Sequence, residues 1–89
     1  MKKELQKRAL RRLKIIEGQV RGLQKMVEEE KYCVDVITQS QAIKEALSSF
    51  EDVMLENHLE THVAHQMKTG KEKQATQEIV KVYKLSRKK

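Results

Sequence analysis

Residues 9–27 read ALRRLKIIEGQVRGLQKMV, and apolar positions in this stretch recur at alternating spacings of four and three. These positions are Ala9, Leu13, Ile16, Val20, Leu23 and Val27. Such a rhythm lays one apolar seam along an α-helix and is typical of helices that pack against another helix. The stretch therefore predicts a long amphipathic helix, which we expect over about residues 4–28.

A second stretch, residues 36–54, repeats this rhythm. Its seam consists of Val36, Ser40, Ile43, Leu47, Phe50 and Met54. The two seams are separated by Glu28, Glu29 and Glu30, and acidic residues at a helix C-terminus oppose the helix macrodipole. We therefore expect a break near residues 29–33 and a second helix over about residues 34–67.

The end of the second helix is marked by Gly70, because glycine is the usual residue after a helix C-terminus. A third and shorter helix is expected over about residues 71–86. The side chains expected to face inward from it are Ala75, Ile79, Val82 and Tyr83. The sequence thus predicts an all-α protein made of three helices in one domain, residues 1–89.

Composition excludes several classes of protein. The chain has a single cysteine, so no disulfide can form within it. No apolar run approaches the roughly 20 residues that a membrane-spanning helix needs. We find no set of nucleophile, base and acid that indicates an enzyme. We therefore expect a soluble, cytoplasmic protein without catalytic activity.

Charge is segregated along the chain. Residues 1–14 hold seven bases and one acid, residues 28–60 hold nine acids and two bases, and residues 71–89 hold seven bases and two acids. A polyanion such as DNA would be attracted to one part of the molecule and repelled by another. A merely solvated surface is the alternative, but the concentration of bases in the first helix favours nucleic acid.

Cys33, His58 and His62 are candidate metal ligands. The two histidines lie four residues apart, so they share one helix face, and they continue the seam beyond Met54. Cys33 precedes His58 by twenty-five residues, which is about 37 Å at the rise of an α-helix. The thiol and the imidazoles can therefore meet only between two copies whose second helices run antiparallel. The alternative is that the histidines are structural and that Cys33 is a small apolar residue at a helix start.

Several segments carry a resemblance to a known family. They are residues 12–14 (RLK), 17–22 (EGQVRG), 32–36 (YCVDV) and 53–62 (VMLENHLETH). With these segments the chain resembles the copper-sensitive operon repressor family, which also includes nickel/cobalt sensors and formaldehyde sensors. The similarity extends over nearly the whole sequence.

The resemblance implies a fold and a function. Members are similar to one another as three-helix protomers that form antiparallel four-helix-bundle dimers and then tetramers, each a dimer of dimers. They are repressors that bind operator DNA through a basic face when metal-free and leave it when metal binds. The family's metal ligands fall on Cys33, His58 and His62, whereas His65 matches no family ligand.

The resemblance also bears on the choice of metal. Many copper sensors have a second cysteine where this chain has His62. The nickel/cobalt branch adds a histidine near the N-terminus that this chain lacks, and the formaldehyde branch has a proline in place of Lys2. Three donors that include a soft thiolate suit copper(I), whereas nickel(II) and cobalt(II) prefer more donors. Copper(I) is therefore favoured, with a nickel-, cobalt- or formaldehyde-responsive repressor as the alternative.

Further roles follow from the same resemblance. Tyr32 and Glu78 match positions that connect a ligating histidine to the third helix, although packing of Tyr32 and pairing of Glu78 with Lys81 are simpler readings. Arg12 matches a DNA-binding arginine, and Ser49 replaces a second such arginine. The residues expected to contact DNA are Lys7, Arg8, Arg11, Arg12, Lys14 and Lys44.

A function of another class remains open on the sequence. A basic helical oligomer of this kind could bind nucleic acid architecturally, without any inducer. Metal affinity distinguishes the two functions, because an architectural protein has no need of a metal site between its subunits.

Overall fold

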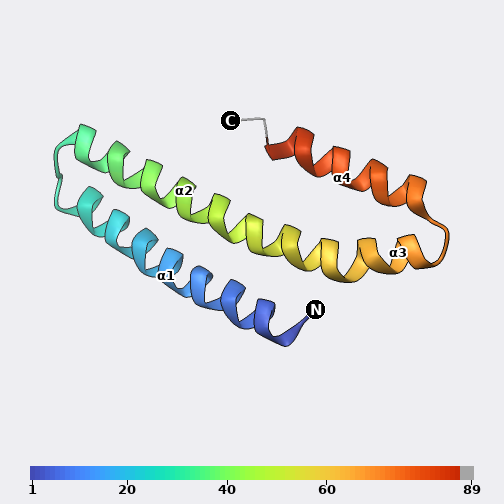
Figure 1. The fold of residues 1–89 in the computed structure, drawn as a ribbon. Helices are drawn as coiled ribbons and strands as arrows, with labels where there is room; N and C mark the ends of the chain where they lie inside the picture. The colour runs from blue at the N-terminus through green and yellow to red at the C-terminus, as the bar shows by residue number, and fades with distance from the viewer. Residues whose placement is uncertain (87–89) are drawn as a thin grey trace. The chain divides into compact units, whose positions relative to one another are not determined.

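The computed structural model describes residues 1–86, all of whose regular secondary structure is helical. The helices are α1 (Lys3–Glu28), α2 (Cys33–His58), the π-helical segment η1 (Leu59–Val63), α3 (Ala64–Lys68) and α4 (Glu72–Ser86) (Figure 1). The predicted all-α class is confirmed. The basic residues Arg87, Lys88 and Lys89, which contribute to the basic C-terminal segment, lie outside the described residues.

The predicted second helix corresponds to three elements that follow one another without a break. His58 has φ −60° and ψ −44°, and Ala64 has φ −59° and ψ −41°, so the backbone is helical on both sides of η1. Helical backbone from residue 33 to residue 68 matches the predicted range of 34–67 and confirms a three-helix fold. The π turn was not predicted. Such turns are frequent at functional sites.

The chain divides into two compact units, Met1–Leu55 and Glu56–Lys89. In the first unit α1 and α2 form an antiparallel hairpin (Figure 1). Leu5 and Ala9, near the start of α1, form a buried cluster with Val53 of α2, and Phe50 packs against it. Ile16 and Ile43 are also buried. The predicted seams therefore contribute Ala9, Ile16, Ile43 and Phe50 to this core, whereas the buried Leu5 and Val53 were not among the predicted seam residues.

The hairpin turn has the hydrogen bonds of a Schellman motif. The Glu30 N–H donates to the Val27 carbonyl at 3.1 Å, and the Lys31 N–H donates to the Met26 carbonyl at 3.0 Å. Glu30 adopts the left-handed conformation, with φ 53°, at the position that glycine usually occupies. The break predicted near residues 29–33 is confirmed, and it ends the helix without a glycine.

In the second unit Gly70 reverses the chain so that α3 lies against α4. Gly70 has φ 77°, and the Lys71 N–H donates to the Gln66 carbonyl at 2.7 Å. The expected C-terminal stop at Gly70 is confirmed. Within residues 56–86 the buried apolar residues are Val63 and Ala75.

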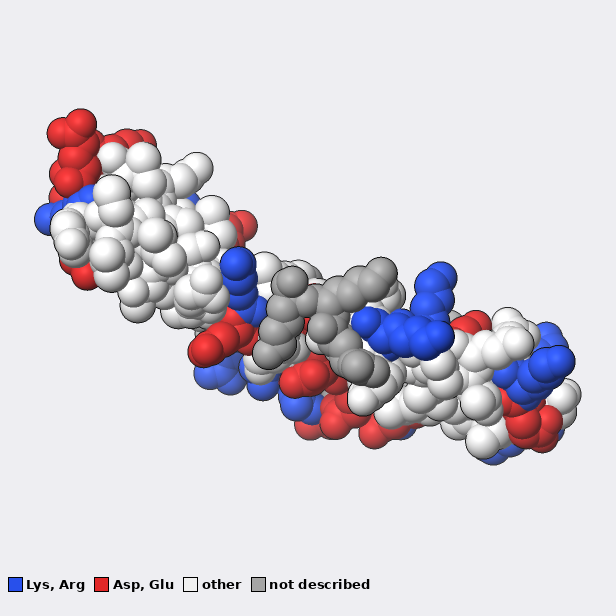
Figure 2. Space-filling view, turned by 90° about the horizontal axis from the view of Figure 1, so that it is seen from above, with Lys and Arg blue, Asp and Glu red and all other residues white. Residues whose placement is uncertain are grey.

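Much of the predicted seam stays exposed in the hairpin. Leu13, Val20 and Leu47 are each about two-fifths exposed, and Val27 is 60% exposed. Figure 2 shows a broad uncharged surface at the end of the molecule that carries the α1–α2 turn. Two helices can cover only one side of each other, so the hairpin leaves apolar side chains without a partner.

Ile79 and Tyr83 of α4, which were expected to face inward, are 38% and 60% exposed, so this expectation was wrong for both residues within the single chain. The helix pair of the second unit is short, and it buries only Ala75 fully from α4. Among the described residues, no helix combines the length and the apolar character needed to cross a membrane.

Candidate metal centre

His58 and His62 present their imidazoles on one side of the second unit. His58 is the last residue of α2 and His62 lies in η1. The ring centroids are 5.3 Å apart, and the ring planes are inclined by 31°. The His58 side chain is 28% exposed, and His62 is exposed. Two neutral imidazoles at this separation are suitable donors for one transition-metal ion.

Glu78 of α4 lies directly behind His58. Its Oε2 atom is 3.0 Å from Nε2 of His58. The distance is that of an ion pair, but the ring is not oriented for a hydrogen bond, so the buried Nε2 has no hydrogen-bond partner within residues 1–86. Because Nε2 faces the carboxylate, Nδ1 is the ring nitrogen left to bind a metal. Ligating histidines commonly direct their second nitrogen to a carboxylate in this way.

The other carboxylate oxygen of Glu78 is held by two amides. Nε2 of Gln66, in α3, donates to Oε1 at 3.3 Å, and Nε2 of Gln74, in α4, donates to the same atom at 3.4 Å. The Gln66 hydrogen bond is the largest cause that lowers the pKa of Glu78 below its ordinary value, and Gln74 and His58 add to it. Glu78 is therefore a carboxylate near neutral pH.

Sequence reasoning did not identify Gln66 or Gln74. A signal for Gln66 was available, because His58, His62 and Gln66 follow one another at a spacing of four and so share a face. Gln74 precedes Glu78 by four residues on α4, which is the spacing of neighbouring side chains on a helix.

Cys33 and Tyr32 lie in the first unit, at the start of α2. Cys33 is a free, exposed thiol, and Tyr32 is 71% exposed. Within residues 1–86 of a single chain, no group of three or more His, Cys, Asp or Glu side chains is arranged to hold a metal ion. His65 is exposed, as expected for a residue outside the site.

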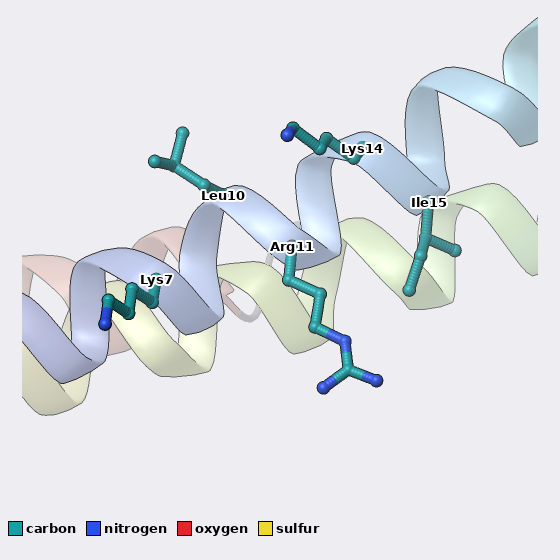
Figure 3. A pocket seen from close by; sticks show the side chains of 5 residues that line it. All are labelled: Lys7, Leu10, Arg11, Lys14 and Ile15. Carbon is teal, nitrogen blue, oxygen red and sulfur yellow. The ribbon is translucent and has the colours of Figure 1, made fainter.

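The basic residues of α1 do not all point in the same direction. Lys7, Arg11 and Lys14 line a shallow hollow together with the exposed apolar residues Leu10 and Ile15 (Figure 3). All five side chains come from one face of α1, and in this view Leu10 and Lys14 point upward from it whereas Arg11 and Ile15 point downward. This is a basic surface with apolar side chains among the charges.

Arg12 faces a different way. Its Nη1 atom donates a hydrogen bond of 2.5 Å to the Ser49 hydroxyl of α2. Arg8 of α1 and Lys44 of α2 are exposed. The side chain of Arg12, one of the six residues expected to contact DNA, is thus hydrogen-bonded to the neighbouring helix of the hairpin.

Comparison with known proteins gives concordant results. The family model described as "Metal-sensitive transcriptional repressor" matches residues 5–85. The chain is 45% identical over 73 residues to the copper-sensing transcriptional repressor CsoR of Bacillus subtilis, which covers 82% of this chain and 72% of that protein. It is 37% identical over 89 residues to CsoR of Mycobacterium tuberculosis (strain H37Rv), which covers 97% of this chain and 75% of that protein.

A solved structure is similar over almost the whole chain. It is the crystal structure of the copper-sensing repressor CsoR with Cu(I) from Geobacillus thermodenitrificans NG80-2, with a TM-score of 0.86 and 41% sequence identity. The match covers 99% of this chain and 92% of that chain. The sequence segments, the three-helix fold and these matches agree, and the chain belongs to the family of metal-sensitive transcriptional repressors.

Proposed function

We propose that this protein is a copper(I)-responsive transcriptional repressor, which binds operator DNA when metal-free and leaves it when copper(I) binds. The observation that carries the proposal is the pair of imidazoles of His58 and His62, with Glu78 behind His58. The relatives named above are copper-sensing repressors from bacteria. We propose that this chain acts in the same compartment as its operator DNA, the cytoplasm.

The donor set fits copper(I). Nδ1 of His58 and an imidazole nitrogen of His62 provide two donors, and the exposed thiol of Cys33 from a second copy provides the third. A thiolate and two imidazoles suit a soft ion of low coordination number. The thiol must lose its proton and the imidazoles must be neutral, so metal affinity rises with pH until these groups are deprotonated.

An intersubunit site requires an oligomer, and the first unit has an exposed apolar surface through which two copies can pack. The exposed apolar residues of the hairpin need a partner, and a second hairpin packed antiparallel would form a four-helix bundle. This arrangement would bring Cys33 of one copy towards His58 and His62 of the other. We propose a homodimer of this kind, with two dimers forming a tetramer.

The chain's own residues connect the metal site to α4. When bound, copper(I) would supply a fixed point that draws His58 and His62 towards the thiolate of the second copy. Movement of the His58 ring can align its Nε2–H with Glu78, and the contact of 3.0 Å would then become a hydrogen bond. Tyr32 would lie beside the same site, because it precedes Cys33. The conformation that makes these contacts binds DNA less well, and copper(I) shifts the population towards this conformation, so the repressor leaves DNA.

The basic surface of α1 is the proposed DNA contact. Within residues 1–86, Lys7, Arg11 and Lys14 form no ion pair, so their charges are available to phosphates. Such contacts release counterions and give affinity without a helix-turn-helix. Arg8, Arg12 and Lys44 complete the proposed set.

The test is DNA-binding anisotropy with a labelled operator fragment, titrated with copper(I) and separately with nickel(II). Copper(I) should release the wild-type protein at one equivalent per protomer. Cys33→Ala should bind DNA but no longer bind copper(I) tightly. His65→Ala changes an exposed histidine outside the site and should behave as wild type.

Release of the Cys33→Ala variant at one equivalent of copper(I) would contradict the proposed site. Release of the wild type by nickel(II) and not by copper(I) would contradict the proposed metal. DNA binding that no metal affects would favour the architectural function.

A further inference from the structure

Gln66 shares a helix face with His58 and His62 but is not one of the proposed metal ligands. Gln66 lies four residues beyond His62, and it faces Glu78 rather than a histidine. Its amide nitrogen donates to Oε1 of Glu78 at 3.3 Å, whereas Oε2 of the same carboxylate lies 3.0 Å from His58. The two oxygens of Glu78 are thus divided between a neutral amide and the ligating histidine.

We propose that Gln66, assisted by Gln74, is a positioning residue that holds the Glu78 carboxylate with Oε2 against His58. This inference rests on the proposed function, because it concerns how metal binding at His58 is communicated to α4. Without the amides, Glu78 would keep its charge but would lose the contacts that fix its orientation. Metal would still bind, and the signal to α4 would weaken.

The need for a positioning residue follows from exposure. The Glu78 side chain is 36% exposed, so water competes for both of its oxygens. A long flexible carboxylate in that setting has several rotamers, and only some of them bring Oε2 to His58. Two donors on Oε1 select among these rotamers. Because these donors are neutral amides, they fix the orientation of the carboxylate without forming an ion pair that would replace its interaction with His58.

The burial of Gln66 supports this assignment. Its Oε1 atom is buried without a hydrogen-bond partner within residues 1–86. The opposite amide orientation would place that oxygen against the Glu78 carboxylate, where two acceptors would repel each other. Among the described residues, the Gln66 side chain has a hydrogen bond to Glu78 and to no other residue, so this bond accounts for its orientation.

The experiment replaces the donors and keeps the shape. Gln66→Met removes the N–H group and retains an unbranched side chain, and Gln66→Met with Gln74→Met removes both donors. Gln77→Met is the matched control, because Gln77 is an exposed residue of α4 that makes no hydrogen bond to Glu78. The measurement is the ratio of DNA dissociation constants with and without saturating copper(I).

The expected result is retained copper(I) stoichiometry, unchanged metal-free DNA affinity and a smaller ratio. A hydrogen bond to a charged acceptor corresponds to a change of about tenfold or more, so Gln66→Met should reduce the ratio by about that factor. The double variant should reduce it further, and the control should not change it. The ¹⁵N NMR signal of His58 Nε2 should also move in the Gln66 variant, which a purely structural role would not require.

Failure of this inference is separable from failure of the proposed function. If copper(I) does not release the wild type, the proposed function is wrong. If copper(I) releases the wild type and the double variant by the same factor, the positioning role is wrong and the repressor stands. Reduced thermal stability with an unchanged ratio would equally overturn the positioning role.

Discussion

The Arg12 guanidinium is bonded to the Ser49 hydroxyl at 2.5 Å, across the two helices of the hairpin. Arg12 therefore points towards α2, whereas Lys7, Arg11 and Lys14 line the hollow on an exposed surface of α1. Adjacent residues of a helix point in different directions, so a run of bases in the sequence does not form one continuous surface. The basic helix has a side that ties the hairpin together and a side that is open to a polyanion.

The Arg12–Ser49 hydrogen bond should contribute to the stability of the hairpin. Ser49→Ala removes the acceptor and should lower the free energy of unfolding by about 0.5–1.5 kcal/mol, measured by urea denaturation at fixed protein concentration. Ser48→Ala is the control, because Ser48 is exposed and has the same effect on helix propensity. Equal stabilities of the two variants would show that the bond contributes nothing.

The open side of α1 should supply the salt-dependent part of DNA binding. Arg11→Ala should weaken binding, and the slope of log affinity against log salt concentration should fall in magnitude by about 0.9 for one lost phosphate contact. Arg21→Ala is the control, because Arg21 also lies on α1 but pairs with Glu17 at 3.6 Å, outside the hollow. An unchanged slope for Arg11→Ala would exclude this surface from the DNA interface.

Glu78 should be needed for copper(I) to release the protein from DNA, but not for copper(I) binding itself. Glu78→Ala leaves all three proposed donors in place, so the variant should bind copper(I) with unchanged stoichiometry. Its metal-bound form should remain on DNA, with a loss of about 1–3 kcal/mol of coupling free energy, measured by anisotropy with and without copper(I). Glu72→Ala, in the first turn of α4, should retain coupling. Full release of Glu78→Ala by copper(I) would mean that the signal takes another route.

The turn at Glu30 offers a stabilising substitution. A non-glycine residue in the left-handed conformation is strained by about 1–2 kcal/mol. Replacing it with glycine removes this strain, but glycine loses more conformational freedom on folding, which cancels part of the gain. Glu30→Gly should therefore raise the free energy of unfolding by about 0.5–1 kcal/mol, measured by thermal or chemical denaturation. Glu30→Ala separates the two effects of the change, because it removes the charge at the end of α1 but keeps the unfavourable φ. A variant Glu30→Gly no more stable than Glu30→Ala would contradict this account.

The helices could be predicted because their signals are local. The seam from Ala9 to Val27, the three glutamates and Gly70 each act within a few residues, and the observed helix ends differ from the predicted ones by at most one residue. Burial was less predictable, because it depends on partners. Val27 and Tyr83 have the spacing of core residues but are exposed in the single chain.

The candidate site could be predicted in part. The spacing of His58 and His62 indicated a shared face, and the structure places Glu78 against His58. The hydrogen bonds from Gln66 and Gln74 to Glu78 could not be predicted from spacing alone, because the Gln66 bond requires α3 and α4 to fold back on each other at Gly70. The different directions of Arg12 and Arg11 likewise depend on where α2 packs along α1.

The π turn of η1 sets the phase between the two halves of the helix that it joins. In a regular α-helix, residues at i+4 and i+8 rotate away from residue i by about 40° at each step. A wider turn reduces this drift, which helps to keep His58, His62 and Gln66 in one column. The Thr61 hydroxyl of η1 donates to the Asn57 carbonyl of α2 at 2.7 Å. Deleting one residue from η1 would restore α-helical winding and rotate everything after it by about 100°. The length of this single turn therefore decides whether His58, which precedes η1, faces the carboxylate of Glu78 in α4, which follows it.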